Sequence, residues 1–204
     1  MNFIIANKFK ELIADLPFAD VLAGLTKIHK VEIPNEGGQP FMEIYPIECA
    51  VTSEQIINGD YKDLSPDSSK RSVMYFEDLG IQFNDKNTNE IVYQSRLRLI
   101  GWLNLSHFVG GGCSMSAQVI ANILQALPYS PINVQGDINL TKLHVVSTLE
   151  LPKNADIFLR YSYKEEKTQY LMYPFDFFAI ELTTVFTLPF KCIPEIEMQD
   201  PQKC

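Results

Sequence analysis

Residues 91–103 read IVYQSRLRLIGWL, and this stretch decides the class of fold. One set of alternate positions in it is mostly apolar, and polar residues predominate in the other set up to position 98. The apolar set is Ile91, Tyr93, Leu97 and Leu99, and the polar set is Gln94, Arg96 and Arg98. Successive side chains of a strand point to opposite faces of its sheet. The stretch therefore predicts a long strand with one face in a core and the other against water or a partner.

A second extended run, residues 73–83, precedes this strand. The seven residues between the two runs, 84–90, are all polar and cannot repay the cost of burial. We therefore expect a β-hairpin whose tip, residues 84–90, protrudes from the domain.

Two other segments have helical spacing. In the first, apolar residues recur every three or four positions from Ile5 to Leu16, and Pro17 follows. In the second, Ser114 stands where it can cap a helix after the glycines at 110–112, and an apolar stripe runs to Leu127. We expect an N-terminal helix and one central helix packed on the sheet.

The remaining segments have mostly strand composition. Residues 28–33 and 41–45 flank a turn and predict a hairpin, and further strands are expected at 143–151, 155–164 and 175–188. The fold class is therefore α+β, with a mainly antiparallel β-sheet. We expect a single domain over residues 1–192, with a polar loop insertion at 52–71 that has room for one helical turn. A short acidic tail, residues 193–204, follows it.

Composition excludes several classes of protein. The 204 residues are 46% hydrophobic and carry a formal net charge of −8, which excludes disorder, collagen-like repeats and pure coiled coil. No stretch approaches the ~18 to 20 apolar residues of a membrane-spanning helix, and the N-terminus does not have the pattern of a secretory signal. The negative balance disfavours a protein that holds nucleic acid on a basic face. We expect a soluble, acidic domain without a membrane partner.

No pattern indicates catalytic, cofactor-binding or metal-binding residues, so we expect no enzyme and no cofactor. Ser106 and His107 are adjacent and would point to opposite sides of an extended chain, which is a poor arrangement for a nucleophile and its base. The glycines at 110–112 lack the spacing of a phosphate-binding loop. The three histidines are isolated from one another and from the four cysteines, so we assign no zinc and expect reduced thiols.

The order of these elements resembles that of the tail terminator proteins of long-tailed bacteriophages and related caps of phage-like tail tubes. The resemblance covers a short N-terminal helix, a strand like residues 93–102 that leads into a helix like residues 114–127, and a long final strand like residues 175–188. This chain is longer than the compact members of that family. The extra length lies in the insertion at 52–71 and in residues 155–172.

The resemblance implies a structural virion protein, made in the bacterial host cytoplasm, that acts in the tail or neck of the particle. Its homohexameric ring would stop tail-tube polymerisation and contact the tail-tube protein and a neck or head-completion protein. DNA would pass through the ring without sequence-specific binding. The candidate contacts with other subunits or the lumen are Asp85, Lys86, Asn87, Arg96, Arg98 and Glu181.

Such a ring needs two different surfaces on each subunit. Arg96 and Arg98 could form one, and an acidic patch with Glu181 the other. Alternatively, the two arginines pair with carboxylates on neighbouring strands of their own chain. Other functions also stay open: another phage neck or tube component, a β-barrel-like module that binds a small molecule as a monomer or dimer, or an enzyme whose site is assembled from distant residues.

Overall fold

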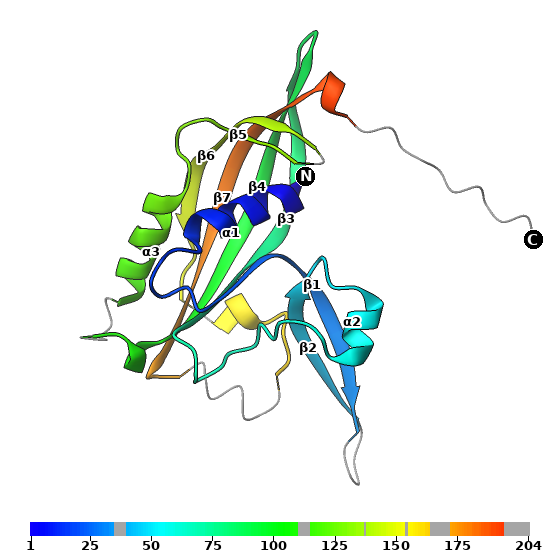
Figure 1. Ribbon diagram of the computed structural model, residues 1–204. Coiled ribbons are helices and arrows are strands. Elements are labelled where there is room, and N and C mark those ends of the chain that lie inside the picture. Colours follow the sequence, from blue (N-terminus) through cyan, green and yellow to red (C-terminus); the bar gives the residue numbers. More distant parts are fainter. Residues whose placement is uncertain (35–39, 110–114, 137, 154, 164–171, 194–204) are drawn as a thin grey trace, which may run out of the picture.

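A computed structural model of the chain describes residues 1–34, 40–109, 115–136, 138–153, 155–163 and 172–193. Seven strands form one open sheet in the order β2-β1-β3-β4-β7-β6-β5 (Figure 1). Their bounds are β1 Val21–Ile33, β2 Phe41–Glu48, β3 Ser72–Lys86, β4 Glu90–Asn104, β5 Ile132–Val134, β6 Leu140–Glu150 and β7 Phe175–Pro189. β1 and β3 run parallel, and the other neighbouring strands run antiparallel. The α+β class with a mainly antiparallel sheet is confirmed.

Two helices cover one face of the sheet, α1 (Asn2–Ile13) and α3 (Met115–Ala126) (Figure 1). Both were expected, and each packs its apolar stripe into a first core. Phe9 of α1 and Ile123 of α3 meet the buried side chains of Leu97 and Phe178 in that core. The pairing of β4 with β7 runs without a register shift from Glu90 to Asn104, which keeps alternate residues of both strands on this face.

The opposite face carries a second core that is rich in aromatic residues. Trp102 and Tyr75 from the sheet pack there with Phe158, Tyr161 and Tyr163. Residues 157–163 thus cover this part of the sheet. The strand expected at 155–164 is wrong. Residues Ala155–Phe158 form a 3₁₀ helix, and beyond it one isolated bridge joins Ser162 to Ile44 of β2. The apolar composition of this segment reflects burial against a sheet face and not membership of a sheet.

The expected hairpins are present, with different limits. The first is confirmed, but β1 begins at Val21, seven residues before the expected start, because its first part pairs with β3. In the second, β3 and β4 extend into the polar stretch 84–90 and leave only residues 87–89 as a turn. The side chain of Asn87 makes this possible, because its Oδ1 accepts from the backbone N–H groups of Asn89 and Glu90 at 3.0 Å each.

The polar insertion at 52–71 contains one short helix, α2 (Ser53–Asn58). Thr52 and Gln55 form a reciprocal cap at its start, and Gly59, with φ of 69°, ends it. The expected capping residue Ser114, the glycines at 110–112 and the tail beyond residue 193 lie outside the described residues.

Candidate assembly surfaces

Arg96, Arg98 and Glu181 lie together on the sheet face opposite α1 and α3. Arg98 and Glu181 are direct partners in the β4–β7 register. Arg98 Nη2 donates to Glu181 Oε1 at 2.8 Å, and Arg96 Nη2 donates to Oε2 at 3.1 Å. The interpretation that pairs the arginines with carboxylates on neighbouring strands is confirmed. Because cross-strand partners share a face, these residues form one surface and not the two separate surfaces expected.

Glu77 of β3 lies at the buried end of this cluster, with 3% of the residue exposed. One of its carboxylate oxygens lies 2.7 Å from Arg160 Nη1 and 3.6 Å from Arg98 Nη1. The other accepts a hydrogen bond from the Tyr161 hydroxyl. Glu77 therefore ties the segment that covers the second core to the sheet. The sequence places Glu77 in an expected strand, but nothing in its pattern distinguishes it from a solvent-facing carboxylate.

Two groups of this cluster, Glu181 and Tyr161, have shifted pKa values. The hydrogen bond from Arg98 holds the pKa of the Glu181 carboxyl below its ordinary value, partial burial opposes this, and Arg96 adds to the lowering. Burial raises the pKa of the Tyr161 hydroxyl, and the neighbouring charge of Glu77 adds to that effect. Tyr161 thus stays protonated and donates to Glu77 at neutral pH. The cluster joins β3, β4 and β7 to residues 160–161, which belong to the segment that covers the second core.

The hairpin tip is attached to two other elements. Lys142, at the start of β6, donates to Glu90 Oε1 at 2.8 Å, and Phe190 N donates to the carbonyl of Asn89 at 2.9 Å. Of the candidate contacts, Asp85 accepts from the backbone N–H of Lys86, and the Lys86 Nζ lies 5.4 Å from the centre of the Phe190 ring. Asn87 shapes the turn. A role of these three residues toward another subunit stays a prediction.

Parts of the sheet edge, on β2, β3 and β6, are protected against pairing with another chain. Beyond Phe76, β3 no longer pairs with β1. This part of β3 carries two bulges, one of which includes Gly80 with φ of 104°. On β2, Ile44 exchanges backbone hydrogen bonds with Ser162, and on β6 the N–H of Val145 donates to the carbonyl of Pro128. Bulges and covering segments of this kind disfavour edge-to-edge association. Contacts with a partner are therefore more readily made by other surfaces.

One such surface is a two-stranded projection, which we call the arm: residues 27–33 of β1 and 41–47 of β2. The register of β1 with β3 ends at Leu25, and beyond it β1 and β2 leave the main sheet (Figure 1). The inner face of the arm contributes Tyr45 and Ile47 to the second core. Its outer face exposes Ile28 to 42% and Met42 to 45%.

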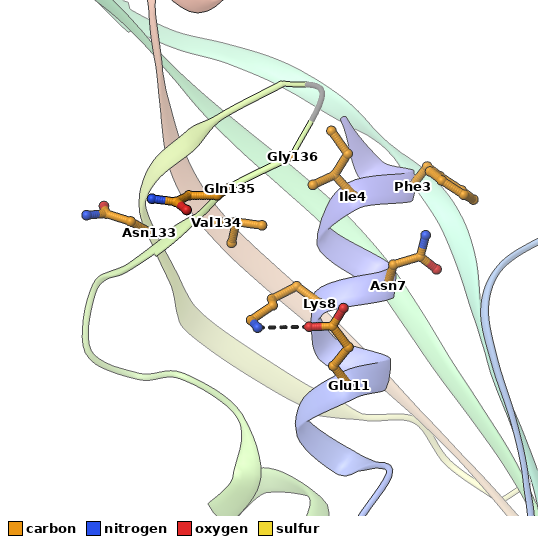
Figure 2. A pocket seen from close by; sticks show the side chains of 9 residues that line it. All are labelled: Phe3, Ile4, Asn7, Lys8, Glu11, Asn133, Val134, Gln135 and Gly136. Atoms are coloured by element: carbon orange, nitrogen blue, oxygen red, sulfur yellow. Dashed lines mark hydrogen bonds and ion pairs between the residues drawn. The ribbon is translucent and has the colours of Figure 1, made fainter.

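A second surface is a hollow of about 520 Å³ between α1 and β5 (Figure 2). The α1 residues that line it are Phe3, Ile4, Asn7, Lys8 and Glu11, and the residues of β5 and the loop after it are Asn133, Val134, Gln135 and Gly136. Phe3 is 41% exposed, although it is a large apolar side chain in the first turn of the helix. Lys8 Nζ lies 2.8 Å from Glu11 Oε2 at the rim.

Another hollow, of about 450 Å³, lies on the other side of α1 at the base of the arm. It is lined there by Gly24, Leu25, Glu48 and Ala50, and it shares Phe3, Asn7 and Glu11 with the first hollow. The outward residues of α1 therefore form a ridge between two depressions. Helical spacing alone identifies the buried side of α1 but not the shape of its surroundings.

The candidate nucleophile Ser106 and the described cysteines do not form a catalytic or metal-binding cluster. Ser106 lies in the short 3₁₀ helix Leu105–His107, and its hydroxyl donates to Asn104 Oδ1 at 2.6 Å. Cys49 and Cys192 are free and half-buried. Within the described part of the chain, no group of three or more histidine, cysteine or acidic residues could hold a metal ion. No helix in the same ranges is long and apolar enough to cross a membrane.

Comparison with models of known protein families and with curated proteins found no match to this chain.

Proposed function

We propose that the chain is a structural virion protein that forms a hexameric ring at the head-proximal end of a phage tail. There it would terminate tail-tube polymerisation and join the tail to the neck. The order of elements supports this, since the N-terminal helix, the strand that precedes α3 and the long final strand β7 all have the places expected from the terminator proteins.

The arm is the observation that carries the proposal. It leaves the sheet of its own chain, and its outer face shows apolar side chains that a lone subunit would leave in water. The protected parts of the sheet edge and the exposed arm favour a subunit that associates through defined surfaces and does not form open-ended sheets. A closed ring requires two different surfaces on each subunit, and the arm and the α1 ridge are different surfaces.

The charge of the chain suits a passage for DNA. A net charge of −8 repels phosphate, so DNA can move past such a ring without being held. The proposed protein partners are the tail-tube protein on one side and a neck or head-completion protein on the other.

A ligand-binding module is the competing function, and the structure favours it less. The sheet is open, with β2 and β5 at its ends, and both hollows described above lie at the surface beside α1. Neither is the enclosed interior that a barrel-like carrier provides for a small molecule.

The test is the mass of the purified chain in solution, measured by light scattering after size exclusion at several concentrations and two salt levels. We expect a species of six times the 23.2 kDa chain mass, and negative-stain images with a central pore. When the chain is added to preformed tail tubes, it should halt the further growth of those tubes at the head-proximal end. A chain that stays monomeric at every concentration and does not bind tube ends would refute the proposal.

A further inference from the structure

We infer that the arm of one copy docks in the hollow between α1 and β5 of the next copy. This inference rests on the self-association proposed above and names the surfaces that carry it. The occupant is a second copy of this chain.

The arm needs a covering partner. A two-stranded ribbon is marginally stable in water unless it packs against something else. The inner face contributes Tyr45 and Ile47 to the second core, whereas Ile28 and Met42 on the outer face remain exposed to 42% and 45%. The two side chains share one face of the arm and lie four residue positions apart, at opposite ends of a stretch that also carries Lys30 and Glu32.

The hollow offers the complementary features. It has a partly exposed aromatic side chain, Phe3, and the neighbouring Ile4, both of which would gain from apolar cover. Its volume of about 520 Å³ is of the size that admits several side chains. The opposite wall is formed by Asn133, Val134, Gln135 and Gly136, and the amide groups of Asn133 and Gln135 are directed away from α1 (Figure 2).

The charges match as well. On the outer face of the arm, Lys30 and Glu32 stand next to the apolar residues, and Glu32 is the cross-strand partner of Met42. The hollow presents one positive and one negative side chain, Lys8 and Glu11, at its rim. An arm that places Met42 near Phe3 can therefore set Glu32 toward Lys8 and Lys30 toward Glu11. Such pairing fixes orientation more than it adds affinity.

The geometry selects a second copy over the same chain. The arm continues β1 away from the sheet, and its base adjoins the hollow on the other side of α1, lined by Gly24 and Glu48. The hollow beside β5 is thus separated from the chain's own arm by the α1 ridge. Because donor and acceptor surfaces differ, repeated contacts run head to tail and close into a ring when the rotation allows.

Cysteine cross-linking between two populations tests this contact. In a background with Cys49, Cys113, Cys192 and Cys204 replaced by serine, one population carries Met42→Cys and the other carries Asn133→Cys at the hollow. Ile57→Cys, on α2 outside both surfaces and 83% exposed, replaces Asn133→Cys in the control. After mixing and mild oxidation, we expect disulfide-linked dimers from the first pair and at most a trace from the control.

A second variant measures the contribution of the arm. Met42→Asp should raise the concentration at which the assembly dissociates at least about tenfold, since it places an unpaired charge in the contact. Ile57→Asp should leave this concentration unchanged. If light scattering shows an oligomer but the cross-link does not exceed the control, the docking inference is wrong and the ring proposal stands. A chain that is monomeric throughout overturns the docking inference, and one that also fails to bind tube ends overturns the ring proposal.

Discussion

Replacement of Gly101 by alanine should cost much more than the same change at Gly24. Gly101 lies in the last third of β4, opposite Phe178 of β7. A Cβ at Gly101 would lie 2.2, 2.4 and 2.9 Å from three carbon atoms of the Phe178 ring. Carbon atoms pack at about 3.5 to 4.0 Å, so the ring would have to move by more than about 1 Å inside a core where it is fully buried.

Overpacking of this kind costs about 1 to 3 kcal/mol of the free energy of unfolding. It must also outweigh the gain of up to about 1 kcal/mol that alanine brings by restricting the unfolded chain. Because a contact of 2.2 Å is far inside the packing distance, we take the upper end of that cost, about 3 kcal/mol, which leaves a net loss of about 2 kcal/mol. Such a loss lowers the melting temperature by roughly 4 to 8 °C in a domain of this size. Gly24→Ala is the matched control. Its Cβ would lie 2.0 Å from Asn7 Oδ1, the end of a half-buried side chain that can rotate away, so the loss should stay below about 1 kcal/mol.

Urea unfolding followed by the fluorescence of Trp102, the single tryptophan, measures both variants. The Phe178→Leu background supplies the decisive comparison, because removal of the ring should reduce the penalty of Gly101→Ala to less than about 1 kcal/mol. The reasoning is refuted if Gly101→Ala costs no more than Gly24→Ala, or if its cost is unchanged in the Phe178→Leu background.

Three further changes test the site. Glu77→Gln should destabilise the chain by about 3 kcal/mol, because it leaves Arg98 and Arg160 beside an uncharged group, and urea unfolding would contradict this if the midpoint did not move. Since the folded-state pKa of Glu181 is lowered, its stabilising effect is full above its ordinary pKa of 4.5 and is lost as the pH falls through the folded value. The difference in unfolding free energy between the unmodified chain and Glu181→Gln should accordingly shrink from pH 7 to pH 3, and a constant difference would exclude this linkage. Asn87→Ala removes the acceptor of two backbone N–H groups and should cost about 1 kcal/mol, with faster amide hydrogen exchange at Asn89 and Glu90; unchanged exchange would show that the side chain does not hold the turn.

The central strands and the two covering helices could be predicted from the sequence because each has a clear period. In β4 apolar and polar residues alternate up to Leu99, in β7 they alternate from Phe178 onward, and α1 and α3 have one broad apolar stripe each. Residues 155–163 have no clear sequence period that would identify their secondary structure. Their aromatic residues suit a strand or a covering segment equally, and only the presence of an apolar sheet face decides between them.

The candidate surfaces were predictable in part. Alternation placed Arg96 and Arg98 on the face away from the helices, but their partners depend on strand order, which brings Glu181 beside Arg98 and Glu77 on the other side. The arm was visible as a hairpin and not as a projection. The arm separates from the sheet at Leu25, where β1 stops pairing with β3. The sequence around Leu25 has no pattern that predicts the end of this pairing.

This separation also determines how the chain would bear a mechanical load. A pull on the far end of the arm travels along β1 and enters the body where Val21, Leu22 and Leu25 pair in parallel with β3. Force along a strand loads such hydrogen bonds in shear, so that they resist together and do not open one after another. The Thr26 hydroxyl donates to the carbonyl of Phe76 at 2.9 Å, which adds one more hydrogen bond between β1 and β3 where the arm leaves the sheet. Tension on the arm would thus be carried by the centre of the sheet.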